Sequence, residues 1–412
     1  MAGPAITSAA VTEHRVVVTG MGPVSSIGTG WWRFVAALRT GRSGVSPISA
    51  FDTTGFAHAN GCEVRGFRPE RYIRRLAPAD LGRASQFAVA AAALALRKAG
   101  VTPGSLAGRR GLVSIGTTDG ESQDLDQATE LCLRGGVRAV PVEVIRRYPA
   151  SWISAWVAHE FGLAAVEAVT LPTACAAGNY AIGYAFDVLR SGEAEYALCG
   201  GADAMCRKTF AGFYRLGAIA EESCQPFDAD RRGILTGEGA GMLFLETLDS
   251  ARQRGAHVYA EIRGYGLSCD AKHPVAPDRA SIVSCIRRAH KHAGIDRSEV
   301  GFVSAHGTGT KANDLTEAAA IREVFGDPAP PTVSVKSMLG HAMGAASALA
   351  ALACVAALEY GFIPPTINHR RTDPDCALDC VPNEARPATL SVAQNNAFAF
   401  GGNNSVLILA VP

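Results

Sequence analysis

The chain has 412 residues, of which 48% are hydrophobic and 19% are charged, and its formal net charge at pH 7 is +1. This length suits two or three average domains or one large fused unit, with enough apolar residues for a substantial core. The charge balance excludes a general nucleic-acid binder, which would carry a strong basic excess.

Predicted strands and helices alternate along the whole chain. Short β-branched runs occupy residues 16–19, 111–115, 197–199, 242–246, 302–305 and 405–409, and alanine-rich helical stretches such as 84–99 and 316–325 lie between them. This alternation is typical of α/β layers with largely buried strands. No low-complexity linker divides the chain, and the nearest approach to a seam is a polar helix within residues 246–258, which ends at Gly255.

The sequence predicts neither a membrane protein nor a secreted one. Residues 1–13 lack a basic start and a long apolar stretch, so they do not predict a secretory signal. Residues 342–358 are uncharged but fall short of the roughly 20 residues that span a bilayer, which predicts a buried helix. The 11 cysteines are scattered singly, without CxxC pairs or zinc-like spacing to histidine. We therefore expect reduced thiols in a cytoplasmic protein without a metal site.

Cys175 is the first candidate functional residue. It lies among small residues at 170–179, where a predicted strand turns into a helix-like stretch from Tyr180 to Arg190. At such a corner, unpaired backbone N–H groups and the positive end of the helix dipole lie beside the sulfur. Both stabilise a thiolate and favour nucleophilic attack.

Three glycine-marked corners in the last third of the chain supply possible partners for this cysteine. His306 stands in a Gly-Thr-Gly-Thr turn after the predicted strand at 302–305, and Lys336 and His341 precede a helix of small residues. Phe400 leads into a glycine pair between two predicted strands. One cysteine and two histidines at separate corners are typical of a site assembled from distant segments.

With their flanking residues, Cys175, His306, Lys336 and His341 resemble the β-ketoacyl-ACP synthase II branch of the thiolase-like condensing enzymes. The resemblance covers nearly the whole chain: residues 15–20 match the opening strand, 226–233 and 237–241 the middle, and 398–403 the closing turn. Within this branch, the ketosynthase subunit of a type II polyketide synthase is one candidate.

The resemblance implies a five-layered α-β-α-β-α fold built from two duplicated halves. We place the boundary near residue 255, so that residues 1–255 carry the nucleophile and residues 256–412 carry Lys336 and both histidines. Family members are normally dimers through the first half. The resemblance therefore implies a homodimer, or a heterodimer with a homologue of the chain-length-factor type.

The implied reaction is a decarboxylative Claisen condensation. An acyl group would move from an acyl carrier protein to Cys175, and the carbanion left by malonyl decarboxylation would attack it. Neutral N–H groups of His306 and His341 could hold the enolate oxygen, and the backbone N–H groups of Cys175 and Phe400 could form the oxyanion hole. The resemblance implies no cofactor beyond the phosphopantetheine arm of the carrier.

Other residues have supporting roles by resemblance. Lys336 resembles an organising residue that pairs with an acid and positions a histidine, and Glu317 matches that acid, although a solvated helix position is an equal alternative. Asp314 is expected to cap a helix beside the site. Thr308 and Thr310 resemble threonines that bind the pantetheine arm, with turn stabilisation as the alternative. Phe400 resembles a gate, with a core phenylalanine as the alternative.

A basic patch for the acidic carrier is expected near the tunnel mouth. The residues that align with such a patch are Arg71, Arg74, Arg75, Arg207 and Lys208. The alternative for any such cluster is a solvated charged face.

Two departures from primary-metabolism relatives favour a specialised substrate, such as a growing polyketide or polyene chain. The segment 116–122, which borders the acyl pocket in the family, is more polar here, and residues 176–179 differ from the commoner endings after the cysteine. A housekeeping fatty-acid synthase II remains an alternative.

A non-catalytic chain-length partner is another alternative, but such partners lack the nucleophile that Cys175 provides. A degradative thiolase would need a second cysteine near the C-terminus, and residues 397–412 contain none. Initiating synthases use Cys-His-Asn, whereas Lys336 and His341 favour the two-histidine elongating class.

Overall fold

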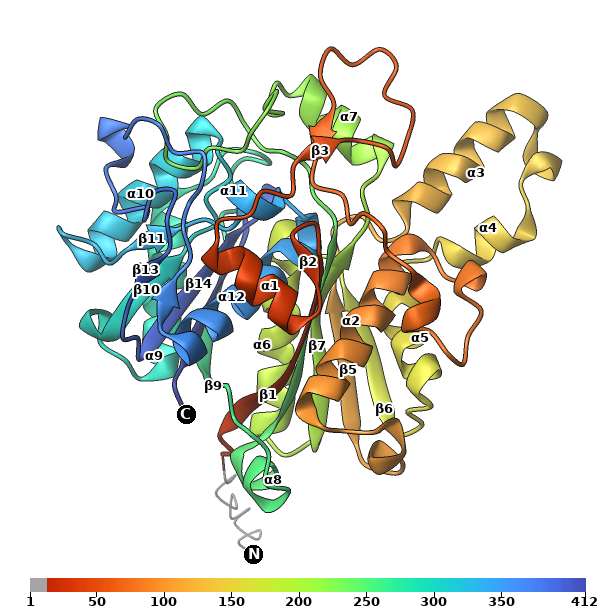
Figure 1. Ribbon diagram of the computed structural model, residues 1–412, viewed down its shortest axis with the longest axis horizontal. Coiled ribbons are helices and arrows are strands. Elements are labelled where there is room, and N and C mark those ends of the chain that lie inside the picture. Colours follow the sequence, from red (N-terminus) through yellow and green to blue (C-terminus); the bar gives the residue numbers. More distant parts are fainter. Residues whose placement is uncertain (1–12) are drawn as a thin grey trace, which may run out of the picture.

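The computed structural model describes residues 13–412 (Figure 1). Residues 1–12, which include nearly all of the segment expected to lack a secretory signal, lie outside the described residues.

Strands from both ends of the chain form one 11-stranded sheet in the order β11-β10-β14-β15-β9-β1-β8-β7-β5-β6, with β2 beside β1. The strands that precede residue 255 are β1 (Val16–Ser25), β2 (Gly28–Thr29), β5 (Gly111–Gly116), β6 (Val166–Leu171), β7 (Tyr196–Asp203) and β8 (Gly239–Thr247). Those that follow it are β9 (Ala260–Cys269), β10 (Val300–Ser304), β11 (Thr332–Val333), β14 (Val392–Phe398) and β15 (Asn403–Ala410). Two small pairs complete the strands: β3 (Ser46–Pro47) with β4 (Asn60–Gly61), and β12 (Phe362–Ile363) with β13 (Arg386–Pro387).

The main strands repeat one topology twice. With the short β2 set aside, each half contributes five strands. Numbered in chain order, both halves place them as third, second, fourth, fifth and first across the sheet. In both, the second strand is parallel to the third and fourth, and the fifth is antiparallel to its two neighbours. Within the sheet, the two halves pair through β1 and β9, from Val16 opposite Ile262 to Val18 opposite Ala260. This repetition confirms the expected fold of two duplicated halves.

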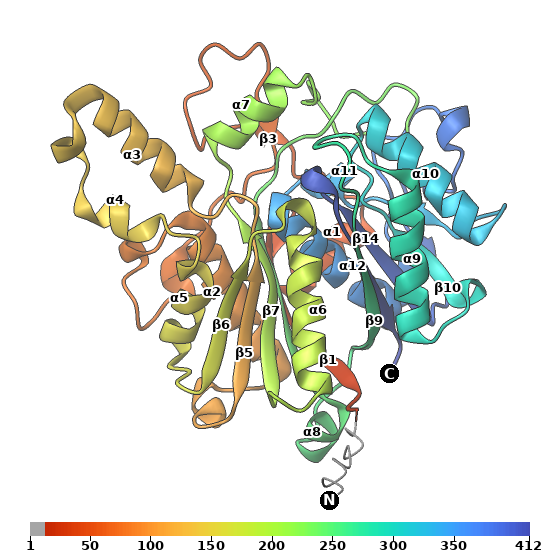
Figure 2. The same cartoon turned by 180° about the vertical axis from the view of Figure 1, so that it is seen from behind.

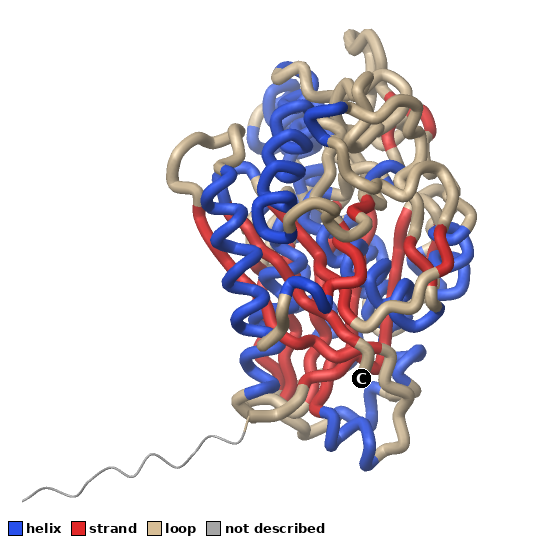
Figure 3. The backbone as a smooth tube through the Cα atoms, turned by 90° about the vertical axis from the view of Figure 1, so that its left-hand side faces the viewer, coloured by secondary structure: helices blue, strands red, loops and turns tan. Residues whose placement is uncertain are grey.

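Helices cover both halves of the sheet and fill the space between them. On one outer face, α2 (Arg83–Ala99) and α5 (Trp152–Phe161) pack on the first half, and on the other α9 (Arg279–Ala293) and α10 (Lys311–Phe325) cover the second. Between the halves, α6 (Ala177–Arg190) and α12 (Ala346–Tyr360) contact strands of both. Figure 2 shows α6 between β7 and β9, and Figure 3 shows helices on both outer sides of the strands, so that the layers run α-β-α-β-α.

The remaining helices lie at the ends of these layers. They are α1 (Trp31–Arg39), α3 (Ser122–Gly135), α4 (Val142–Arg147), α7 (Arg207–Arg215), α8 (Leu248–Gln253) and α11 (Lys336–Leu339). Helices α3 and α4 form an arm that projects from the body of the molecule (Figure 2).

The helix expected within residues 342–358 is α12. Among the described residues one helical segment, Met343–Tyr360, is long and apolar enough to pass a membrane-span test, but 89% of it is buried inside the protein. Alanine dominates its sequence, which lets it fit closely between two sheets. It is therefore a core helix, as the sequence predicts.

Candidate active site

The candidate catalytic residues lie at the carboxyl ends of equivalent strands. Cys175 follows β6, the third strand of the first half, and Lys336 and His341 follow β11, the third strand of the second. His306 follows β10 and Phe400 follows β14. Because parallel strands carry their carboxyl ends to one edge, residues far apart in sequence meet in one place.

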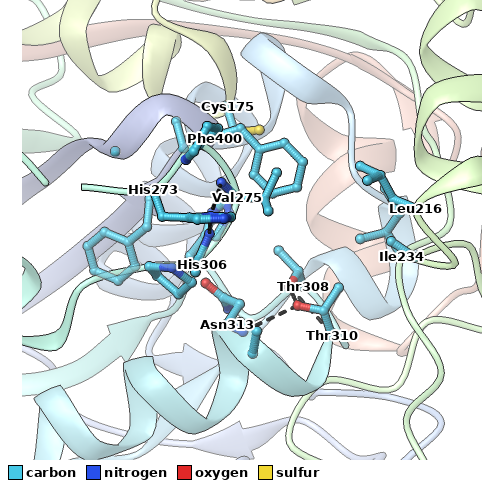
Figure 4. Close-up of a pocket in the computed structure, with 18 of the residues that line it drawn as sticks. Cys175, Leu216, Ile234, His273, Val275, His306, Thr308, Thr310, Asn313 and Phe400 are labelled. Carbon is cyan, nitrogen blue, oxygen red and sulfur yellow. Dashed lines mark hydrogen bonds between the residues drawn. The ribbon is translucent and has the colours of Figure 1, made fainter. Parts of the chain in front are cut away.

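A cavity of about 240 Å³ is lined by all of these residues except Lys336. Cys175 and Phe400 lie near one end of the view in Figure 4, with Thr308 and Thr310 along one wall and Leu216 and Ile234 facing them. Cys175, His306 and His341 all line this cavity. The structure thus brings together the nucleophile and the two histidines that the sequence singles out.

The turn before Cys175 is tight. Ala174 has a φ of 52°, a left-handed conformation that is uncommon for a residue other than glycine. A short 3₁₀ turn, Ala174–Ala176, then leads directly into α6. The equivalent turn of the second half repeats this strain, since Met343 has a φ of 48° just before α12.

The thiol of Cys175 does not match the expected stabilised thiolate. Only 5% of the residue is exposed, and burial raises its pKa to about 12. The positive charge of Lys336 and the backbone N–H of Phe400 lower the pKa, but burial is the larger effect. The resting nucleophile is therefore a thiol, and the expectation from the helix dipole alone was wrong because it left out desolvation.

His306 and His341 are buried neutral imidazoles. Their ring centroids lie 5.4 Å apart with the planes at 82°. Burial, followed by the charge of Lys336, lowers the pKa of each well below 6.5. Nδ1 of His341 accepts a hydrogen bond from the backbone N–H of Met343 at 3.1 Å. In the neutral ring the proton is therefore on Nε2, which makes that atom a hydrogen-bond donor.

Lys336 is buried and holds the backbone of the His306 turn. Its Nζ donates to the carbonyl oxygen of His306 at 2.5 Å. Burial lowers its pKa, and the charge of Glu317 acts in the opposite direction. This ammonium therefore positions one histidine and sets the electrostatic environment of both.

Glu317 is fully buried on α10, which excludes the solvated alternative. Its Oε1 accepts from the backbone N–H of His306 at 2.8 Å, and its Oε2 from that of Gly307 at 2.7 Å. Lys336 makes no ion pair with it within 4.0 Å among the described residues. The expected direct pairing is thus corrected: the lysine and the glutamate fix the same turn by different backbone atoms.

Asp314 is not the helix cap that the sequence suggests. Thr310 caps α10, because its side chain accepts from the backbone N–H of Asn313. The Asp314 carboxylate, one turn further on, accepts from the backbone N–H groups of Phe227 and Thr308 at 2.9 and 3.0 Å. Burial raises its pKa to about 6. Asp314 therefore ties two loops together beneath the site.

Thr308 and Thr310 line the cavity, and their hydroxyl oxygens lie 2.8 Å apart. This contact and the cap on α10 show that turn stabilisation occurs. Both threonines also stay on the cavity wall (Figure 4), so turn stabilisation does not exclude a second role.

Phe400 is not a core residue, since 40% of it is exposed. Its ring lies 5.2 Å from that of Phe213 on α7, and Gly401 and Gly402 behind it have φ of 83° and 78°. A Cβ on Gly402 would lie 2.6 Å from the Cβ of Asp270, so this position needs glycine for space as well as for conformation.

The sequence motifs do not identify the acidic residues beside Cys175, which are Asp119 and Asp203, although Asp119 lies in the polar segment 116–122. Asp203, at the end of β7, accepts from the Thr117 hydroxyl at 2.6 Å and from the Gly344 backbone N–H at 2.5 Å. Burial, followed by the charge of Asp119, raises its pKa. One buried oxygen of Asp119 has no hydrogen bond. The sequence feature that could have identified this group is the aspartate at the end of the buried strand β7.

The expected docking residues are all exposed but do not line the catalytic cavity. Arg207 and Lys208 begin α7, whose later residue Phe213 does line it. Lys208 forms an ion pair with Asp119 at 3.1 Å. Arg71 lines a separate hollow of about 530 Å³, and further arginines on its walls are Arg33, Arg42, Arg65 and Arg68. The sequence did not reveal this group because its members are scattered.

Comparisons with known proteins agree with this geometry. Residues 13–251 match the β-ketoacyl synthase N-terminal domain and residues 259–370 match its C-terminal domain. Nodulation protein E of Rhizobium meliloti (strain 1021) is 39% identical over 404 residues, covering 96% of this chain and 98% of that protein. The 3-oxoacyl-[acyl-carrier-protein] synthase 2 of Synechocystis sp. (strain ATCC 27184 / PCC 6803 / Kazusa) is 38% identical over 407 residues, with coverage of 96% and 97%.

Among solved structures, the ishigamide ketosynthase/chain length factor superposes with a TM-score of 0.96 at 56% identity, covering 97% of this chain and 100% of that one. Both domain matches, the full-length relatives and the superposition on a solved ketosynthase structure lead to one conclusion. The chain belongs to the β-ketoacyl synthase family and is a condensing enzyme of the acyltransferase type.

Proposed function

We propose that this protein elongates an acyl chain held on Cys175 with a malonyl unit delivered by an acyl carrier protein. The observation that carries the proposal is the meeting of a buried thiol with two neutral imidazoles in one cavity. A nucleophile that is protonated at rest, together with uncharged donors, suits chemistry in which negative charge develops on thioester oxygens.

In the first step, the Cys175 sulfur attacks the acyl thioester, and its proton leaves with the released carrier thiol. The backbone N–H groups of Cys175 and Phe400 would hold the oxyanion. Burial raises the pKa of this thiol, and the backbone N–H of Phe400 is among the groups that lower it.

In the second step, the malonyl thioester loses CO₂ and its electron pair becomes an enolate. Nε2–H of His341 and the ring of His306 would stabilise the enolate oxygen. The new carbon–carbon bond forms at the acyl carbonyl carbon, and the Cys175 sulfur leaves and regains a proton. Burial, together with the charge of Lys336, lowers the pKa of both imidazoles and so favours the neutral form that this role needs.

Thr308 and Thr310 would bind the pantetheine arm, and Phe400 would move between acylation and condensation. The exposed arginines of η1 (Pro69–Arg71) and the start of α7 suit an acidic carrier. No step requires a cofactor other than the carrier's own phosphopantetheine, and we place the enzyme in the cytoplasm.

We further propose a specialised substrate, such as a polyketide or polyene chain, and a second chain in the working enzyme. The support for a specialised substrate is the polar segment 116–122, where the buried carboxyl group of Asp203 bonds to the Thr117 hydroxyl and to the backbone of Asp119. The arm of α3 and α4 exposes large apolar residues, including Leu133 and Val137, and the edge strand β6 has an unpaired side. Because the nucleophile is present, this chain would be the catalytic member of any heterodimer.

Intact-mass analysis tests the proposal directly. The protein and its Cys175→Ala variant are incubated with carrier proteins loaded with different acyl chains. An acyl adduct on the wild-type protein alone supports the nucleophile, and the preferred adduct identifies the substrate class. Preference for plain saturated chains over oxidised or polyunsaturated ones would refute the specialised substrate. Absence of any adduct, even with a copurified homologue that lacks the cysteine, would refute the proposal itself.

A further inference from the structure

A chain of buried polar side chains leads away from the His306 turn to the outer helix layer. Asn396 donates from Nδ2 to Oε1 of Glu317 at 3.1 Å, and Gln394 donates from Nε2 to Oδ1 of Asn396 at 2.8 Å. His290 on α9 then contacts Oε1 of Gln394 through Nε2 at 2.7 Å. All four side chains are buried.

Strand geometry explains why this chain forms. Gln394 and Asn396 are two positions apart on β14, so both side chains point to the same face of the sheet, towards α9 and α10. The intervening Asn395 points the other way, where it bonds to Asn179 and to the Ser347 carbonyl. Two adjacent asparagines therefore belong to separate networks.

The direction of every hydrogen bond in the chain is determined by the carboxylate at its end. A carboxylate of Glu317 that accepts bonds from the backbone N–H groups can only accept from Asn396 as well. Asn396 must then use its NH₂ group here and its oxygen towards Gln394, and Gln394 must do the same one step further. His290 is consequently protonated on Nε2, and burial lowers its pKa, which keeps it neutral. The dipoles all point their positive ends at Glu317.

We propose that His290, Gln394 and Asn396 are positioning residues that hold the Glu317 carboxylate, and through it the His306 turn, in the geometry needed for decarboxylation. The assignment rests on the proposed function and extends it to residues remote from the cavity. Glu317 bonds to the backbone N–H of His306, so a rotation of this carboxylate displaces the imidazole that would hold the enolate oxygen. Cys175 follows a strand of the other half, and among the described residues its side chain makes no hydrogen bond to these four side chains.

The test separates the two half-reactions in the full-length protein. Acylation of Cys175 is followed by intact mass, and decarboxylation by CO₂ release from a malonyl-loaded acyl carrier protein. The variants are Asn396→Leu, Gln394→Met and His290→Leu. We expect Asn396→Leu, which loses a hydrogen bond to a charged group, to lose about tenfold or more in decarboxylation. Gln394→Met and His290→Leu, which lose hydrogen bonds between neutral groups, should lose about fivefold, and acylation should stay within about twofold in all three variants. A purely structural role would reduce both half-reactions together.

Two comparisons keep the test decisive. His290→Gln retains an N–H donor and should recover most of the decarboxylation lost in His290→Leu, even if the central variants fold poorly. Ile286→Val, also buried on α9, removes a methylene without a polar contact and should change neither half-reaction. If the wild-type protein releases CO₂ and the variants release it at the same rate, this assignment is wrong and the proposed function still stands. A wild-type protein that neither accepts an acyl chain nor releases CO₂ would overturn the proposed function together with it.

Discussion

Replacement of Glu317 by glutamine tests how the His306 turn is held. The carboxylate accepts four N–H donors, two on each oxygen: the backbone groups of His306 and Gly307, and the side chains of Asn313 and Asn396. A glutamine has nearly the same shape but only one acceptor oxygen. Whichever way the amide is turned, its NH₂ group faces two donors, so two hydrogen bonds to a charged group are lost.

The size of the effect follows from that count. Each such bond contributes about 1.5–3 kcal/mol, so we expect the free energy of unfolding to fall by about 3 kcal/mol or more. If the turn shifts instead of unfolding, the same energy appears as a decarboxylation rate lower by about 100-fold. Urea unfolding measures the free energy of unfolding, and CO₂ release from malonyl-loaded carrier protein measures the decarboxylation rate.

Glu323→Gln provides the matched control, because it makes the same substitution on the same helix. Its side chain is 37% exposed and pairs with Arg279 on the surface, so the loss should stay below about 1 kcal/mol. The reasoning would be refuted if Glu317→Gln were as stable and as active as Glu323→Gln.

Three further predictions follow from the site. Because the pKa of Cys175 is raised to about 12, its alkylation by iodoacetamide should accelerate about tenfold per pH unit from 7 to 10; a plateau in this range would contradict the burial argument. Because the pKa values of His306 and His341 are lowered well below 6.5, both rings should stay neutral between pH 6 and 8 and gain a proton only as the pH falls far below that range. Histidine NMR, assigned with the two His→Asn variants, should show no titration there. Gly402→Ala, with its φ of 78° and its close approach to Asp270, should lower the condensation rate at least tenfold, whereas Gly104→Ala, which meets open space, should not.

The sequence was a good guide to the positions at strand ends. Cys175, His306 and Phe400 each follow an apolar run and stand beside glycines or small residues, and this local pattern alone marks a corner. The α/β alternation was equally visible, because buried strands are nearly continuous apolar runs. The strand order was not visible in the sequence, because strand pairing joins residues as distant as Val16 and Ile262, and their sequence neighbours do not indicate it. For that step the family resemblance was needed.

The errors in the sequence-based description share one physical cause. Cys175 was expected to ionise easily, and Asp314 was expected to cap a helix, because both inferences used only neighbouring residues. The structure adds burial, which raises the pKa of both groups. It also adds partners from other segments, such as the Phe227 backbone for Asp314. Desolvation depends on what packs from a distance, and it outweighs local effects once a group is enclosed.

Burial also explains why the site can work with uncharged groups. Lys336 is the cation whose charge lowers the pKa of both histidines, and its own pKa is held up only by acidic neighbours such as Glu317. Without that glutamate the lysine would lose its proton more easily, and the histidines would then be less strongly biased towards the neutral form. Hydrogen bonds from N–H donors gain strength in an enclosed, low-dielectric cavity, and they need no counter-ion when the enolate is later consumed. The polar chain through Asn396 therefore does more than support one loop: by keeping Glu317 in place, it also keeps an acidic group that favours the charged form of Lys336, and this charge adds to the effect of burial on both imidazoles.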